Sequence, residues 1–169
     1  MEVWDLYDES RNFFGKQHIR GEAIPDGEYH LVVEIFTVNK DGKLLLTQRD
    51  AAKTYSFLWE CTGGSVIAGE SSVIGAVREL EEETGLVANP QELYHIGTLK
   101  KNNHFLDSYI WRSKKNLELT DLKLQAGEVR SAKFVTLDEC EQLNASQLIV
   151  PKVWERFMRY SEVINEWTR

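Results

Sequence analysis

The segment from residue 71 to residue 84 constrains the fold most, because its apolar and acidic side chains both recur at helical spacing. At about 100° per residue, four apolar side chains fall on one side of the predicted helix. They are Val73, Ala76, Val77 and Leu80. This side is predicted to be the face that packs against the rest of the protein. Gly85 follows as a natural C-terminal stop.

Strand-like segments surround this helix. Residues 30–38 are nearly all apolar and β-branched, which is typical of a buried strand, and Gly42 supplies the positive φ of the turn that follows. Further strands are predicted at 43–49, 93–101, 104–113 and 128–137, a short helix at 137–144, and a helical tail from Pro151 onward. Residues 3–8 and 13–20 predict an N-terminal hairpin.

Strands and helices interleave irregularly, so we expect an α/β (α+β) fold with a central mixed sheet covered by helices. Neither repeats nor a Pro/Gly/Ser-rich linker interrupt the chain. We therefore expect one domain over residues 1–169, with residues 1–27 as an N-terminal extension packed on it.

Composition limits the function classes. No apolar run approaches the roughly 20 residues of a membrane span, and the acidic start does not resemble a secretory signal. Cys61 and Cys140 form no metal-type spacing, so a reduced, cytoplasmic protein is expected. The net charge of −7 argues against a nucleic-acid backbone surface but leaves room for a small phosphorylated substrate. A homodimer is left open.

The acidic face of the predicted helix needs an explanation. Glu79, Glu82 and Glu83 have the spacing i, i+3 and i+4, so their carboxylates share one face. Each like-charged pair costs about 0.2–0.5 kcal/mol, so a solvated face is an equal alternative for the helix alone. Gly75, one turn before Glu79, costs about 1 kcal/mol relative to alanine, which predicts that something needs its space.

The wider spacing decides between these alternatives. Fixed residues from Gly64 to Leu86 match the pattern G-x5-E-x7-R-E-U-x-E-E-x-G-U, in which U is aliphatic. Chance agreement is on the order of one in a billion per starting position. The chain therefore resembles the Nudix hydrolase superfamily, and the resemblance implies an α/β/α sandwich. It also implies hydrolysis of a pyrophosphate linkage in a small, nucleotide-derived diphosphate, with Mg²⁺ or Mn²⁺ as cofactor.

The resemblance also implies roles for individual residues. Metal would be held by Glu79, Glu82, Glu83 and the carbonyl of Gly63, and Glu79 would alternatively activate water. Gly64, Glu70, Arg78 and Gly85 would be structural, with Arg78 reaching back to Glu70 near the helix start. Many Nudix enzymes use another glutamate from a later loop, and Glu128 is the residue that we expect to be catalytic here.

A second resemblance, covering residues 4–64, is to isopentenyl-diphosphate isomerase. It implies that Arg49 and Lys53 bind diphosphate and loosely matches His18 and His30 to metal ligands. The isomerase, however, needs a Cys-Gly-His stretch, and those three positions are Gly63, Gly64 and Ser65 here, while Cys61 lies two residues too early. Hydrolysis is therefore favoured, with isomerase activity or a non-catalytic nucleotide-binding module as alternatives.

Overall fold

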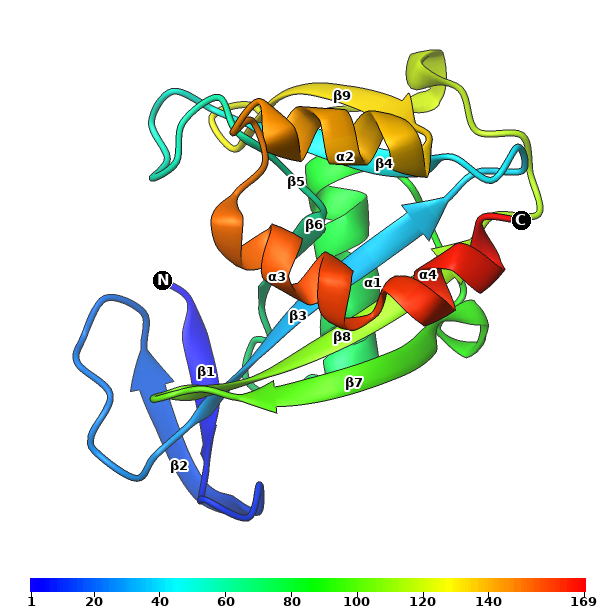
Figure 1. The fold of residues 1–169 in the computed structure, drawn as a ribbon. Helices are drawn as coiled ribbons and strands as arrows, with labels where there is room; N and C mark the ends of the chain where they lie inside the picture. Colours follow the sequence, from blue (N-terminus) through cyan, green and yellow to red (C-terminus); the bar gives the residue numbers. More distant parts are fainter.

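The computed structural model describes residues 1–169 and is built around a mixed β-sheet (Figure 1). Its strands are β3 (His30–Val38), β4 (Leu44–Arg49), β5 (Trp59–Glu60), β6 (Thr62–Ser65), β7 (Tyr94–Lys100), β8 (His104–Arg112) and β9 (Val129–Val135). The strand order is β5-β4-β3-β8-β7, with β6 paired to β3 and β9 to β4. Only β3 and β8 are parallel neighbours, from His30 opposite His104 to Val38 opposite Arg112.

Helices cover both faces of this sheet. Helix α1 (Ser72–Thr84) covers one face, and α2 (Leu137–Ala145), α3 (Pro151–Arg159) and α4 (Ser161–Trp167) cover the other (Figure 1). Two short 3-10 helices, Pro90–Glu92 and Leu119–Asp121, lie in connections. The α/β/α sandwich and mixed sheet predicted from the sequence are confirmed. None of the helices has the length and apolar character needed to cross a bilayer.

Alternation along β3 explains why two cores form. Val33 and Ile35 face α1 and pack in one cluster with its buried Ala76 and Leu80. Phe36, on the other face, packs in a second cluster with residues of α2, α3 and α4. Because successive side chains of a strand point to opposite faces, a central strand with apolar side chains on both faces requires cover on both sides.

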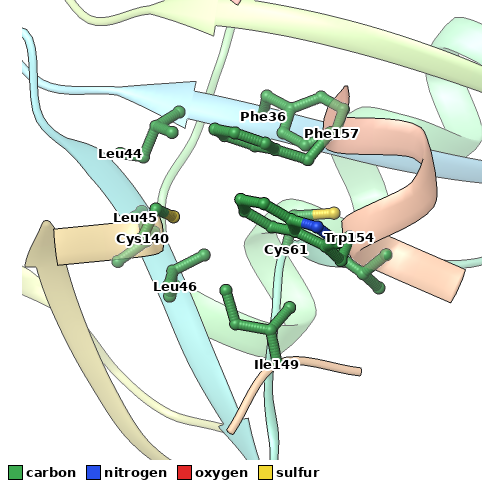
Figure 2. Close-up of a pocket in the computed structure, with 10 residues that line it drawn as sticks. Phe36, Leu44, Leu45, Leu46, Cys61, Cys140, Ile149, Trp154 and Phe157 are labelled. Atoms are coloured by element: carbon green, nitrogen blue, oxygen red, sulfur yellow. The ribbon is translucent and has the colours of Figure 1, made fainter. Parts of the chain in front are cut away.

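The second core contains a small cavity of about 10 Å³, which is at most the room of a single water. Figure 2 shows its apolar lining: Phe36, Leu44, Leu45, Leu46, Cys61, Cys140, Ile149, Val153, Trp154 and Phe157. Both cysteines are free and buried, and burial raises the pKa of the Cys140 thiol to about 11. This region is packed core, and its thiols are poor nucleophiles.

The N-terminal hairpin forms a separate two-stranded sheet of β1 (Val3–Tyr7) and β2 (Phe13–Ile19), as predicted. Arg11 in its turn donates two hydrogen bonds to the buried carboxylate of Asp107 on β8. At the other end, the Trp4 ring stacks on His30 with 4.1 Å between ring centroids. These contacts fix the hairpin against the domain at two places.

The structure differs from the sequence expectation at the C-terminal tail. The tail is not one helix, because Tyr160 leaves helical geometry (φ −104°, ψ 15°) and separates α3 from α4. Its side chain fills the space beside Gly97 of β7, where a Cβ would lie 2.5 Å from the Tyr160 hydroxyl. Gly63 and Gly64 belong to β6, which pairs with β3, and the pairing is close enough that a Cβ at Gly63 would lie 2.3 Å from the Val33 carbonyl oxygen.

Candidate active site

A polar cleft of about 210 Å³ gathers most of the residues that the sequence singled out. Its lining consists of Glu2, Arg20, Lys53, Gly63, Gly64, Ser65, Arg78, Glu79, Glu82, Glu83, Gln125 and Glu128. No hydrophobic side chain lines it. The loop after β4, strand β6, helix α1 and the turn before β9 therefore meet at one place, although they are distant in sequence.

Glycines allow α1 to approach β6 closely. A Cβ at Gly64 would lie 2.3 Å from the Glu79 carboxyl carbon, so the missing side chain leaves the position of the Glu79 carboxylate open. A Cβ at Gly75 would lie 2.9 Å from the Val66 side chain. Val66 therefore occupies the space that the sequence predicted to be needed beside Gly75. Gly85 ends α1 in the left-handed conformation expected of it (φ 75°).

Arg78 is the centre of the polar network. It donates to Glu70 (2.8 Å) as predicted, and also to the carbonyl oxygen of Ser65 (2.9 Å), to Glu79 (2.9 Å) and to Glu82 (3.1 Å). Burial alone would lower the pKa of Arg78, but these carboxylates raise it. As the side chains stand, no three acidic, histidine or cysteine groups surround one point.

Glu83 is the most deeply buried of the three glutamates, with 5% of its surface exposed. Burial, with the charges of Glu60 and Glu79, raises the pKa of Glu83 to about 8, against the opposing effects of Lys53 and the Gly63 backbone. Burial also raises the pKa of Glu79. Buried carboxylates with raised pKa values are most readily ionised when a cation lies beside them.

Lys53 and Glu128 face one another in the cleft as an ion pair, with 2.5 Å between Nζ and Oε2. Arg49, expected to bind diphosphate, is not among the lining residues. Its guanidinium donates to both oxygens of Glu60 (2.7 and 2.8 Å) and to the Thr54 carbonyl oxygen (2.6 Å). Arg49 thus braces the 50–58 loop that carries Lys53.

Sequence reasoning missed part of the cleft. Arg20, just after β2, and its ion-pair partner Glu2 (2.7 Å) enter it from the N-terminal hairpin. Gln125 also lines it. The predicted hairpin was the one available signal for these residues. Spacing along the chain cannot show which charged residues of the hairpin reach the Nudix motif.

The two histidines matched to isomerase metal ligands lie outside the cleft. His18 and His30 are buried, flank the Trp4 ring and do not line the cleft. Cys61 lies in the second core, where its Sγ is 3.5 Å from the Glu34 carboxylate. His18, His30 and Cys61 are therefore not gathered around the acidic helix face, whereas Lys53, which the same resemblance selected, lines the cleft beside it.

Comparison with known proteins supports the family assignment. The NUDIX domain matches residues 28–153. An uncharacterised Nudix hydrolase of Listeria monocytogenes is 38% identical over 156 residues, which is 89% of either chain. An isopentenyl-diphosphate delta-isomerase of Streptomyces avermitilis is 29% identical over 148 residues, covering 83% of this chain and 74% of the isomerase.

A similar fold occurs in a solved structure from Francisella tularensis. This bifunctional NMN adenylyltransferase/ADP ribose pyrophosphatase, complexed with AMP and a manganese ion, superposes with a TM-score of 0.66 at 15% identity. The match covers 84% of this chain and 43% of the Francisella chain. With an intact motif on α1, a matched domain over most of the chain and a close relative along its length, this protein belongs to the Nudix family of hydrolases.

Proposed function

We propose that this protein hydrolyses a pyrophosphate linkage in a small, nucleotide-derived diphosphate, using Mg²⁺ or Mn²⁺. The observation that carries the proposal is the cleft itself, which combines oxygen ligands from α1 and β6 with the cations Lys53 and Arg20. Carboxylate and carbonyl oxygens are the ligands that these hard metal ions prefer. Cations facing them suit the charge of a diphosphate.

The residues present fit a divalent metal. Glu79, Glu82, Glu83 and the Gly63 carbonyl would hold it, and its charge would favour the ionised forms of Glu79 and Glu83, whose pKa values are raised by burial and by neighbouring carboxylates. Arg78 donates to Glu79 and Glu82 in the present arrangement, so its guanidinium would have to release some of their oxygens for them to hold a metal. When bound, the metal supplies charge neutralisation of the diphosphate and a more acidic water.

The remaining residues of the cleft bind and orient the substrate. Lys53 is paired with Glu128, and Arg20 is paired with Glu2. Each cation exchanges its carboxylate partner for a phosphate oxygen when the substrate binds. Release of Glu128 from Lys53 frees its carboxylate to accept a proton from water, with Glu79 as the other candidate base. Arg49 acts indirectly by holding the loop that carries Lys53.

The nucleotide part of the proposal follows from related proteins. The Francisella structure contains AMP and manganese, and its name includes ADP ribose pyrophosphatase activity. The cleft here has no apolar lining, so we assign it to the diphosphate and its metal, with the nucleoside or other leaving group outside it.

The test is a substrate panel of nucleoside diphosphates, triphosphates, dinucleotides and sugar nucleotides, assayed with Mg²⁺ and with Mn²⁺. The expected result is metal-dependent release of a phosphate-containing product from at least one class. Isopentenyl diphosphate is included, and its conversion to the dimethylallyl isomer without hydrolysis of any panel member would contradict the proposal.

A further inference from the structure

A second cavity, of about 310 Å³, lies between the turn joining β7 to β8 and the first part of α3. The turn side contributes Lys101, Asn102, Asn103 and His104, and α3 contributes Lys152, Glu155 and Arg156. The cavity shares no lining residue with the cleft around the Nudix motif. It is therefore a separate feature of the surface.

Arg156 is held in place with part of its guanidinium unused. Its Nε donates to the buried carboxylate of Glu34 (2.6 Å), which also accepts from Ser108 (2.5 Å). Its two terminal nitrogens, Nη1 and Nη2, have no acceptor in the protein, and the side chain lines the cavity. A guanidinium fixed at one nitrogen, with two parallel donors free, matches the oxygens of a phosphate or carboxylate.

Two lysines add charge beside these donors. Neither Lys101 nor Lys152 forms an ion pair or a side-chain hydrogen bond, although many other cations of this acidic protein do. Lys152 lies in the first turn of α3, where no acidic residue accompanies it. A cation at that end of a helix is mildly unfavourable, and an anion bound beside the exposed Lys152 would offset this effect.

The cavity is locally positive in a chain whose net charge is −7. Three cations line it against two carboxylates, that of Glu155 in the lining and that of Glu34, which is paired with Arg156. Burial, together with Lys101, Arg156 and Lys152, lowers the pKa of His104 to about 4, so the imidazole is neutral at pH 7. The amides of Asn102 and Asn103 offer further neutral donors.

We propose that this cavity binds a phosphate group, with Arg156 as the oriented donor and Lys101 and Lys152 as the flanking charges. The phosphate is either a second phosphate on the substrate, which rests on the proposed hydrolysis, or a separate phosphate-bearing effector. Both sources present the same tetrahedral dianion to the same three cations. Arg156 links the cavity to the Nudix motif, because its partner Glu34 lies opposite Gly63 in the β3–β6 pair.

The experiment titrates inorganic phosphate into the ¹⁵N-labelled full chain without divalent metal and follows backbone amide shifts. The expected result is saturable shifts at residues 101–104 and 152–156, with a dissociation constant at least about tenfold higher in the Lys101→Ala/Lys152→Ala variant. Lys40→Ala/Lys115→Ala removes the same charge from exposed, unpaired lysines and should leave the affinity unchanged. Arg156 is retained throughout, because its removal would leave Glu34 buried without its cation.

Absence of shifts at these residues, or equal affinity in the two double variants, would overturn the proposal. Neither result depends on catalysis, so the phosphate-binding proposal can fail or hold whatever the outcome of the substrate panel. With a substrate found on that panel, added phosphate distinguishes the two sources. Competition that raises only KM, and is lost in Lys101→Ala/Lys152→Ala, identifies the substrate's own phosphate, whereas a change in kcat identifies an effector.

Discussion

The ammonium group of Lys53 lies 2.5 Å from the carboxylate of Glu128 across the cleft, so the expected substrate-binding cation and the expected base neutralise one another. Both belong to loops, one after β4 and one before β9. If substrate separates this pair as proposed, the two residues should have separable kinetic effects.

Replacement of each partner tests that separation. Lys53→Ala should mainly raise KM, because it removes a contact to the diphosphate in both ground and transition states. Glu128→Gln should lower kcat by about 10²–10⁴-fold if Glu128 is the base. Steady-state kinetics on the best panel substrate measure both. An unchanged kcat in Glu128→Gln would transfer the role to Glu79.

The metal assignment is tested by Glu82→Gln/Glu83→Gln. This variant should lose Mg²⁺-dependent hydrolysis, since two of the carboxylate ligands are gone, while the metal-free fold stays intact or becomes slightly more stable. Activity assays and thermal unfolding in EDTA measure the two effects. Glu81→Gln, an exposed neighbour on the same helix, is the control. Full activity in the double variant would remove Glu82 and Glu83 from the metal site.

The buried carboxyl of Glu83 predicts a pH dependence of stability. Its folded pKa of about 8 exceeds the ordinary 4.5, so the folded state keeps a proton that the unfolded state releases between these values. The free energy of unfolding of the metal-free protein should therefore fall as pH rises through this window, by up to about 1.4 kcal/mol per pH unit.

Denaturant unfolding in EDTA between about pH 5 and about pH 8 measures this slope. The difference between the wild type and Glu83→Gln isolates the contribution of Glu83, because other titrating groups are common to both. Parallel stability curves for the two proteins would mean that Glu83 titrates normally.

Gly64→Ala tests the close approach of β6 to α1. The new Cβ would lie 2.3 Å from the Glu79 carboxyl carbon, the flexible end of a side chain, so the carboxylate moves while the fold is kept. We expect kcat to fall about 10–100-fold, because a small misplacement of a catalytic group is costly. Thermal unfolding should change little. A wild-type rate would show that Glu79 works from its displaced position as well.

The contact between Arg11 and Asp107 holds the hairpin that delivers Arg20 and Glu2 to the cleft. Arg11→Ala leaves the buried Asp107 carboxylate with only neutral donors, and should cost about 2–3 kcal/mol in the free energy of unfolding. Arg11→Ala/Asp107→Asn should recover part of that loss. Lys16 lies on the same hairpin and forms an exposed ion pair with Glu28, which precedes β3. Lys16→Ala breaks that pair and should cost less than about 1 kcal/mol in the free energy of unfolding.

The family resemblance implied the sandwich. The sequence pattern by itself determined the central strand, the acidic helix and the shared face of its glutamates. These are local properties: periods of 3.6 and 2 residues and a spacing of fixed residues do not depend on the rest of the chain. The same locality explains the contact between Arg78 and Glu70, two turns apart, and the left-handed stop at Gly85.

Only the tertiary structure decided which distant charges meet. Arg49 pairs with Glu60 outside the cleft, whereas Arg20 enters it from the hairpin. Arg156 reaches Glu34 across 122 residues of sequence, which opens its other donors to a second cavity. The physical reason is that the packing of whole helices and strands, together with burial, sets the partner of a long and flexible cationic side chain. Neither packing nor burial of this kind leaves a periodic pattern in the sequence.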